Sequence, residues 1–412
     1  MTDLGTRGAL PGSAALRRAA PALAGYAAVR ALGLLALAVW SAARDKSAYT
    51  LLTARWDALW YTRVAELGYG YEVRLPNGDV HSNLAFFPLL PWLERLLHAV
   101  TPLSYGGAGL VVSLVASLAA AWGIFAVADL RYGRRAGVCA VLLWAVLPVG
   151  VVQSMAYSES LFTALAAWSL YAVLTGRWVT AGALAALAGL TRPAGLAVVA
   201  AVWTAGALSF GGARSAEPAQ SARTEVRAPC PSPHPLARRE RTAWGAHRTR
   251  RALGLLLAPL GTAGYVLWVG HRTGRGPLGY LDVQAGWRNG FDGGYAFARF
   301  IIDKFTSIPS AVAGLGLIAG VTLLLLLYAV CARRRQPLPL LVYTGAVLAL
   351  ALCASSYFGS KPRLLLPAFP LLFPLAVTLA RLRTTRSALV VTGVAVASAL
   401  YGAWWLNGSG PP

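Results

Sequence analysis

Long apolar runs recur along most of the chain, and short arginine clusters separate them. Each run is close to the roughly 20 residues that a helix needs to cross a bilayer, and none alternates as a strand would. The pattern predicts an all-α, polytopic transmembrane helical bundle of about eleven helices. The predicted spans are about 20–42, 108–127, 137–153, 161–175, 179–190, 194–210, 252–269, 307–327, 338–353, 364–380 and 388–405.

The composition agrees with a membrane protein. Of 412 residues, 57% are hydrophobic and 13% are charged, whereas soluble domains carry roughly 25% charged residues. The formal net charge of +22 does not indicate a nucleic-acid partner, because the arginines are not joined by an aromatic-basic surface. The rule that basic loops stay in the cytoplasm accounts for the arginines instead. We therefore expect the protein to lie in the cell membrane, with membrane lipids as partners.

The arginine clusters also divide the chain. With Arg17 and Arg18 inside, residues 1–19 form a cytoplasmic tail, and 20–210 form an N-terminal transmembrane catalytic module. Its large outer loop, 44–107, is expected to carry interfacial helices, because the apolar stretch 83–101 also contains prolines and charges. A disordered basic cytoplasmic loop is predicted at 211–251, followed by a C-terminal half at 252–412 with an outer loop at 270–306.

No cofactor or metal site is expected. The cysteines Cys139, Cys230, Cys331 and Cys353 are scattered without paired spacing, and no His/Cys/Asp group has the spacing of metal ligands. A glycine motif for nucleotide binding is also missing from the sequence. A soluble nucleotide-sugar donor is therefore not supported.

Asp57 is the candidate catalytic residue of the outer loop. Helical spacing places Asp57 and Tyr61 on one face, and Trp56 with Trp60 on or near another face that would lie against lipid. Partial desolvation there could raise the basicity of the carboxylate and prepare it to take a proton. The alternative is an aromatic-belt helix in which Asp57 is a solvated charge or an N-cap.

Two further segments place charge on the outer side. Glu159 stands between two serines where a helix begins, so helix capping competes with substrate contact as its role. Arg192 lies in a tight turn between two apolar helices, where it could bind phosphate or extend its charge to the interface. Lys361 and Arg363 are basic on the outer side, which favours an anionic ligand or lipid headgroups.

The remaining candidates are weaker. Gln284 and Trp287 in the late outer loop could contact a sugar, although loop polarity alone predicts such residues, and a lone histidine such as His81 is more often structural. Arg30 falls inside the first predicted span, where a charge is costly unless it faces the bundle or a polar cavity. The sequence assigns it no role.

Taken together, these segments resemble the PIG-V family, the GPI mannosyltransferase 2 group and its bacterial relatives in the GT-C class of membrane glycosyltransferases. The Ala/Gly/Arg-rich composition is typical of a high-GC bacterium. The resemblance is carried by Arg55–Ala58 (RWDA), Ala65–Tyr69 (AELGY), Asn83–Pro91 (NLAFFPLLP), Tyr157–Phe162 (YSESLF), Gly189–Leu196 (GLTRPAGL), Pro277–Gln284 (PLGYLDVQ) and Arg363–Pro370 (RLLLPAFP).

The resemblance implies transfer of mannose from a polyprenyl-phosphate donor to an acceptor hydroxyl on the extracytoplasmic side, with inversion. Asp57 would be the general base. Arg192, Lys361 and Arg363 would bind the donor phosphate. The residues expected to bind substrate are Trp56, Tyr61, His81, Glu159, Gln284 and Trp287. The acceptor stays open among a lipid-linked glycan, a polysaccharide and a protein.

Two other classes of function compete with this one. A transporter or lipid flippase also needs many spans, but it predicts internal repeats and polar residues near the midplane. A structural membrane subunit without chemistry would not explain the outward basic pair Lys361 and Arg363.

Overall fold

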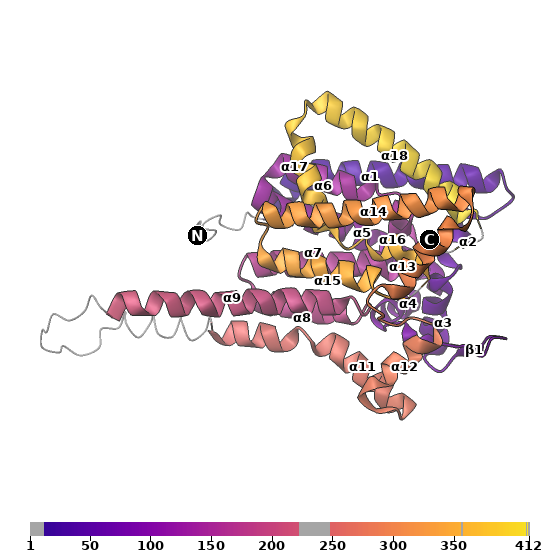
Figure 1. Cartoon of the computed structure of the whole chain (residues 1–412), viewed down its shortest axis with the longest axis horizontal. Coiled ribbons are helices and arrows are strands. Elements are labelled where there is room, and N and C mark those ends of the chain that lie inside the picture. The colour runs from indigo at the N-terminus through magenta and orange to yellow at the C-terminus, as the bar shows by residue number, and fades with distance from the viewer. Residues whose placement is uncertain (1–11, 222–247, 356, 409, 411–412) are drawn as a thin grey trace, which may run out of the picture.

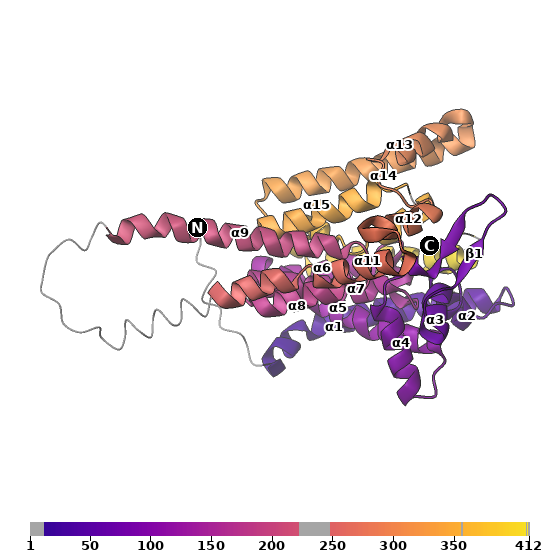
Figure 2. The same ribbon diagram turned by 90° about the horizontal axis from the view of Figure 1, so that it is seen from below.

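The computed structural model describes residues 12–221, 248–355, 357–408 and 410. It is a bundle of roughly aligned helices, with short helices gathered at one end (Figures 1 and 2). The expectation of an all-α membrane bundle is therefore confirmed. In the described residues the only sheet is a hairpin of β1 (Glu72–Arg74) and β2 (Val80–Ser82), which the sequence reading missed despite the Asn77-Gly78 turn.

Five helices in the described part of the chain are long and apolar enough to cross a membrane, or six if one bent pair is counted. The shorter apolar helices α7, α8, α9 and α15 complete the bundle, and the total of about eleven spans remains a prediction. The five long spans are Ser13–Ala42 in α1 (Gly12–Ala42), α5 (Tyr105–Tyr132), Arg248–Thr273, which ends in α11 (Leu260–Thr273), α14 (Ile308–Arg333) and α18 (Thr384–Leu406). The shorter ones are α7 (Ser158–Leu174), α8 (Trp178–Gly189), α9 (Gly195–Ser221) and α15 (Leu338–Leu352).

Two predicted boundaries differ from the structure. The helix α1 begins at Gly12, so the later part of the predicted tail 1–19 is helical. The helix α9 continues to Ser221 and a helix resumes at Arg248, so both ends of the predicted disordered loop 211–251 are helical. Residues 12–19 contain mostly strong helix formers, Ala, Leu and Arg, which explains the first extension. Residues 222–247 lie outside the described part of the chain.

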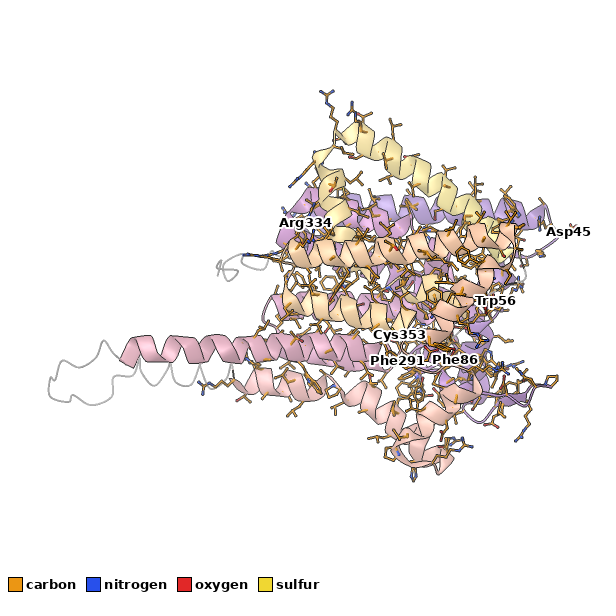
Figure 3. All side chains as sticks on the ribbon, in the orientation of Figure 1. Asp45, Trp56, Phe86, Phe291, Arg334 and Cys353 are labelled. Carbon is orange, nitrogen blue, oxygen red and sulfur yellow. The ribbon has the colours of Figure 1, made fainter. Side chains whose placement is uncertain are left out.

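The short elements of the two predicted outer loops meet at the same end of the bundle (Figure 1). Trp56 and Phe86 lie there, and Arg334 lies at the opposite end (Figure 3), as the separation of outer loops from arginine clusters predicts. The elements of the first loop are α2 (Ala48–Thr53), α3 (Asp57–Leu67), the hairpin, η1 (Asn83–Ala85) and α4 (Leu89–Val100). Those of the late loop are η3 (Gly276–Leu278), α12 (Gly279–Gly286), α13 (Tyr295–Ile302) and η4 (Asp303–Thr306).

The predicted span 137–153 is interrupted. The helix α6 (Arg134–Ala145) ends before Pro148, and the short helix η2 (Gly150–Ser154) follows it. Breaking a helix inside a bundle frees backbone carbonyls that water cannot reach. Buried Arg30 donates to the carbonyls of Ala145 and Gly150, on the two sides of the break. Arg30 therefore has a structural role in the first span.

The predicted span 364–380 is not one continuous helix. The chain forms η5 (Phe358–Ser360), α16 (Lys361–Leu364), η6 (Phe369–Leu372) and α17 (Phe373–Arg381), and it bends by 72° at the break. Pro367 lies in the break, where it cannot donate a helical hydrogen bond. Two buried side chains satisfy freed carbonyls: Trp144 Nε1 donates to Leu366 at 3.0 Å, and the Tyr343 hydroxyl donates to Pro367 at 2.9 Å.

The expected interfacial segment 83–101 contains an amphipathic helix, α4. Trp92 is exposed, as expected at an interface, whereas Glu94 is fully buried against α5. Neither carboxyl oxygen of Glu94 has a hydrogen-bond partner among the described residues, and one oxygen would lie 2.4 Å from a Cβ placed on Gly109. Burial raises the pKa of Glu94 well above its usual range, which favours the protonated carboxyl.

We predict that Arg30→Leu destabilises the bundle. Each carbonyl that loses its donor costs about 1–3 kcal/mol, so the variant should unfold at a lower temperature in detergent. Arg30→Lys should recover part of the loss, because an ammonium group still donates hydrogen bonds. Arg44→Leu, at an exposed position beyond α1, is the control and should unfold as the wild type does. Equal melting temperatures for all variants would contradict the assigned role.

A second prediction concerns pH. Because the folded protein keeps the Glu94 proton that the unfolded chain releases above about pH 4.5, stability should fall as pH rises from there through the folded-state pKa. Glu94→Met should lose this pH dependence of stability. Its free energy of unfolding near pH 8 should exceed that of the wild type by about 1–3 kcal/mol, because an unpartnered polar group is removed. Melting curves from about pH 5 to pH 8 measure the effect, with exposed Glu66→Gln as control. Parallel curves for wild type and Glu94→Met would refute it.

Candidate active site

Four charged side chains from four separate segments form one cluster at the end of the bundle that holds the short helices. Arg363 Nη2 on α16 lies 2.6 Å from Asp57 Oδ2 on α3, and Arg363 Nε lies 3.7 Å from Glu159 Oε1 on α7. Arg192 Nη2, from the turn between α8 and α9, lies 3.0 Å from the same Glu159 oxygen. We call these four residues the charged cluster. The structure therefore joins four of the candidates that the sequence predicted.

Exposure differs across the charged cluster. The Asp57 side chain is 24% exposed, whereas Arg363, Arg192 and Glu159 are 10%, 12% and 2% exposed. Glu159 stands in the first turn of α7, where the helix dipole also favours its negative charge. Asp57 is therefore the most accessible member of the cluster.

Two tyrosines border the cluster. The Tyr61 hydroxyl lies 2.7 Å from the Ser158 hydroxyl, at the start of α7. The Tyr157 hydroxyl is buried without a partner in the described structure, and Arg363 Cζ lies 5.0 Å from the centroid of the Tyr157 ring. Burial raises the pKa of both phenols, and nearby Asp57 adds to this effect. Sequence reasoning gave Tyr157 and Ser158 no role, although their position beside Glu159 was a usable signal.

The backbone before Asp57 is strained. Trp56 has φ +51° and ψ −121°, a conformation that costs a residue other than glycine about 1–3 kcal/mol. Trp56 is the N-cap of α3, so Asp57 is the first helical residue and not the cap itself. The Trp56 ring lies 4.1 Å from the Arg55 guanidinium, and Arg55 Nη1 donates to the carbonyl of Leu406 at 3.1 Å. These contacts hold the backbone that positions Asp57.

Aromatic side chains join the first and late outer loops. His81 stacks on Trp287 with ring centroids 4.0 Å apart, Trp287 contacts Trp60 at 4.9 Å, and Trp60 stacks on Phe86 at 5.6 Å. Burial lowers the pKa of His81. Phe86 also meets Tyr61 edge to face at 5.1 Å. The predicted residues His81 and Trp287 therefore lie together, and Trp60 and Phe86 connect them to Tyr61 at the border of the charged cluster.

Two candidates lie apart from the cluster. Gln284 Nε2 donates to the Tyr280 hydroxyl at 2.5 Å. Lys361 Nζ donates to the carbonyls of Ala351 and Ala354 at 2.8 and 2.7 Å and lies 4.7 Å from the Phe297 ring centroid. Lys361 therefore satisfies carbonyls at the end of α15. It is not a member of the charged cluster that contains Arg363.

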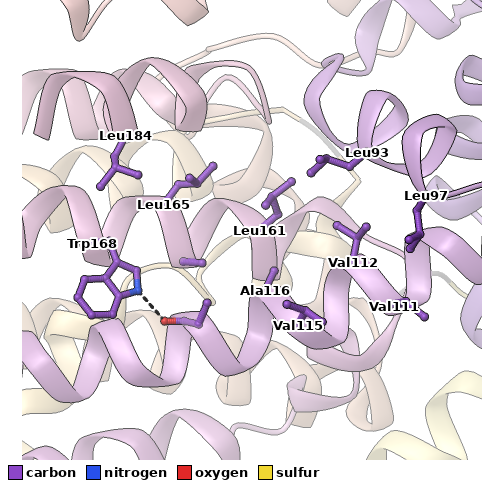
Figure 4. Close-up of a pocket in the computed structure, with 12 residues that line it drawn as sticks. Leu93, Leu97, Val111, Val112, Val115, Ala116, Leu161, Leu165, Trp168 and Leu184 are labelled. Carbon is purple, nitrogen blue, oxygen red and sulfur yellow. Dashed lines mark hydrogen bonds between the residues drawn. The ribbon is translucent and has the colours of Figure 1, made fainter. Parts of the chain in front are cut away.

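An apolar groove of about 590 Å³ runs along α5 and α7, with α4 and α8 at its edges (Figure 4). Leu161, Leu165 and Trp168 line it from α7. Leu161 follows Glu159 by two positions, which is about 200° around a helix. The groove therefore lies on the side of α7 that faces away from the charged cluster, and its lining suits a hydrocarbon chain better than a sugar.

The architecture is that of the GT-C membrane glycosyltransferases. It is similar to the crystal structure of ArnT from Cupriavidus metallidurans bound to undecaprenyl phosphate, with a TM-score of 0.50 and 16% sequence identity. The similarity covers 88% of this chain and 62% of ArnT. At this identity the comparison establishes the fold.

Within that class, residues 31–208 match the family model of the PIG-V mannosyltransferases. The chain is 33% identical over 156 residues to rat GPI alpha-1,6-mannosyltransferase 2, which covers 35% of this chain and 30% of the rat protein. The mouse protein is 32% identical over 154 residues, covering 35% and 29%. The resemblance predicted from the motifs is confirmed over a segment that contains Asp57, Glu159 and Arg192, whereas Arg363 lies beyond it.

We predict that Arg192→Met strongly destabilises the protein, because it leaves buried Glu159 with one cation at 3.7 Å. Breaking such a pair costs about 3–5 kcal/mol. The double variant Arg192→Met/Glu159→Leu should recover most of that loss, since no buried carboxylate remains unpaired. Melting temperatures of the single and double variants in detergent provide the measurement. Exposed Arg177→Met is the control, and purely additive losses would contradict the pairing.

Proposed function

We propose that this protein is a membrane mannosyltransferase that moves mannose from a polyprenyl-phosphate donor to an acceptor hydroxyl on the extracytoplasmic face. The observation that carries the proposal is the charged cluster: an accessible carboxylate, Asp57, lies against the guanidinium of Arg363, with Arg192 beside it. A base and two phosphate-binding cations are the groups that this transfer requires.

Two comparisons support the choice of substrates. The family match and the rodent relatives are mannosyltransferases by name. The ArnT structure holds undecaprenyl phosphate, which is a polyprenyl phosphate. We therefore propose mannose as the sugar and a polyprenyl phosphate as its carrier for this chain.

The proposed step begins when Asp57 takes the proton of the acceptor hydroxyl. The acceptor oxygen then forms a bond to mannose C1, the bond between C1 and the phosphate oxygen breaks, and polyprenyl phosphate leaves with the electron pair. Attack opposite the leaving group inverts the anomeric carbon. Because phosphate is already a good leaving group, one carboxylate base suffices, and a second carboxylic acid is not required.

The other residues have supporting roles in this proposal. Arg192 and Arg363 stabilise the charge of the departing phosphate. Glu159, almost fully buried, orients both guanidinium groups. The neighbouring aromatic group with His81 and Trp287 bounds the space for the sugar or acceptor, and Lys361 is left with its structural contacts.

The alternative function was a transporter or lipid flippase, which predicts polar groups in the middle of the bundle. The buried cation of the first span, Arg30, donates to the carbonyls of Ala145 and Gly150, on the two sides of a helix break, so a structural role accounts for it. This contact favours the enzyme over the transporter.

The test is mannose transfer from radiolabelled polyprenyl-phosphate-mannose to a panel of lipid, glycan and protein acceptors. Asp57→Asn should lower the transfer rate by about 10²–10⁴-fold, the usual effect of losing a general base, while the variant still unfolds cooperatively in a melting curve. Exposed Glu66→Gln on the same helix is the matched control and should keep full activity. Near-normal transfer by Asp57→Asn would overturn the assignment of the base.

A further inference from the structure

Three buried donor atoms of the candidate active site make no hydrogen bond within the described part of the chain. They are the hydroxyl of Tyr157 and the Nε and Nη1 atoms of Arg363. Tyr157 is 0% exposed and Arg363 is 8% exposed. Buried donors without acceptors are destabilising, and native proteins contain few of them. Three such atoms on two neighbouring residues therefore indicate that this place receives acceptors from a ligand.

The two side chains lie close together. Arg363 Cζ is 5.0 Å from the centroid of the Tyr157 ring, and both groups are near Asp57, whose Oδ2 lies 2.6 Å from Arg363 Nη2. The Asp57 backbone N–H is close to the Tyr157 oxygen, but a donor there leaves the O–H group itself without an acceptor. One bound group could therefore accept hydrogen bonds from both residues.

Tyr157 differs from the other buried tyrosines among the described residues. Five more are buried, and the hydroxyl of each has a hydrogen-bond partner: Tyr26, Tyr61, Tyr265, Tyr280 and Tyr343. The bundle thus supplies partners to the hydroxyl groups that it buries elsewhere. A phenylalanine ring would fill the space of the Tyr157 ring without an unsatisfied hydroxyl, so packing alone does not account for this residue.

We propose that the Tyr157 hydroxyl binds the donor phosphate together with Arg363, as a phosphate-binding group additional to the two arginines. This inference rests on the proposed function and deepens it. In the bound state the hydroxyl and the free guanidinium atoms donate to oxygens of one phosphodiester group. Hydrogen bonds to an ionised acceptor are about twice as strong as those between neutral groups. The ligand thereby offsets the cost that these donors carry in the free protein.

The chemistry of the three atoms selects a phosphate. Each atom can donate a hydrogen bond, and phosphodiester oxygens bring acceptors alone, whereas a sugar hydroxyl or a water molecule also brings donors that need acceptors of their own. The fork of guanidinium donors on Arg363 also matches phosphate geometry. The three atoms are closed off from water in this structure, but Asp57, which contacts Arg363, is 24% exposed. A movement of side chains at this edge admits the ligand.

The experiment compares binding with stability. The probe is farnesyl methyl phosphate, a prenyl phosphodiester with one negative charge, and farnesyl acetate is the uncharged control. Tryptophan fluorescence of the full chain in a phosphate-free detergent gives the affinities at neutral pH, and melting curves give the stability. Separate series with phosphatidylglycerol and with inorganic phosphate show whether a lipid headgroup or free phosphate is the ligand instead.

Tyr157→Phe should bind the phosphodiester about tenfold more weakly, the loss expected for one hydrogen bond to a charged group. Its affinity for the acetate should not change, and it should melt at or above the wild-type temperature, because an unsatisfied hydroxyl is removed. Tyr343→Phe is the matched control. Its hydroxyl donates to the Pro367 carbonyl at 2.9 Å, so this variant should melt at a lower temperature and bind as the wild type does. Arg363→Met should lose the preference for the phosphodiester.

Each failure has its own signature. If the wild type binds the phosphodiester no better than the acetate, the polyprenyl-phosphate donor is wrong, and the role of Tyr157 is wrong with it. If the wild type prefers the phosphodiester but Tyr157→Phe binds it equally well, the inference alone is wrong. A lower melting temperature of Tyr157→Phe, or its failure to fold, would also refute the inference, because the hydroxyl would then serve the fold. Phosphatidylglycerol or inorganic phosphate binding as tightly as the phosphodiester would refute the donor as the ligand.

Discussion

This fold depends on one constraint: backbone carbonyls that water cannot reach must accept hydrogen bonds from the protein itself. Continuous helices meet it internally, but this chain breaks two apolar segments within the bundle, and each break exposes carbonyls that need donors. Arg30 supplies them at one break, and Trp144 and Tyr343 at the other. Because the breaks are tolerated, the chain can turn inside the bundle, which places Glu159 and Arg363 at the same end.

The sequence predicted the helices far better than it predicted their interruptions. The apolar length of 364–380 predicted one helix, although Pro367 and Pro370 within it indicated a break. What decides between a kinked span and a true break is a donor elsewhere in the bundle. Trp144 is more than two hundred residues away from its acceptor Leu366, and periodicity carries no information about such pairs.

The site shows the same division between local and long-range information. Charge and sidedness singled out Asp57, Glu159, Arg192 and Arg363, but their pairing came from the structure. Lys361 could have been separated from Arg363 in advance, because residues two apart point to different sides of a helix. Tyr157 had one local signal, its position close to Glu159, although an aromatic residue at a helix start is most often part of the core.

The end of α18 is tied to the first outer loop through Lys46, whose ammonium donates to the Asn407 carbonyl at 2.7 Å, and through Arg55, which reaches Leu406. The residue that precedes Asp57 by two positions is thus fixed by a partner that the ribosome makes about 350 residues later. During biosynthesis the early helices can enter the bilayer in turn, and the loop can contact α5 and the start of α7, but the contact of Arg55 with Leu406 forms only after α18 has been made. The local geometry beside Asp57 therefore depends on a helix that is synthesised long after the loop itself.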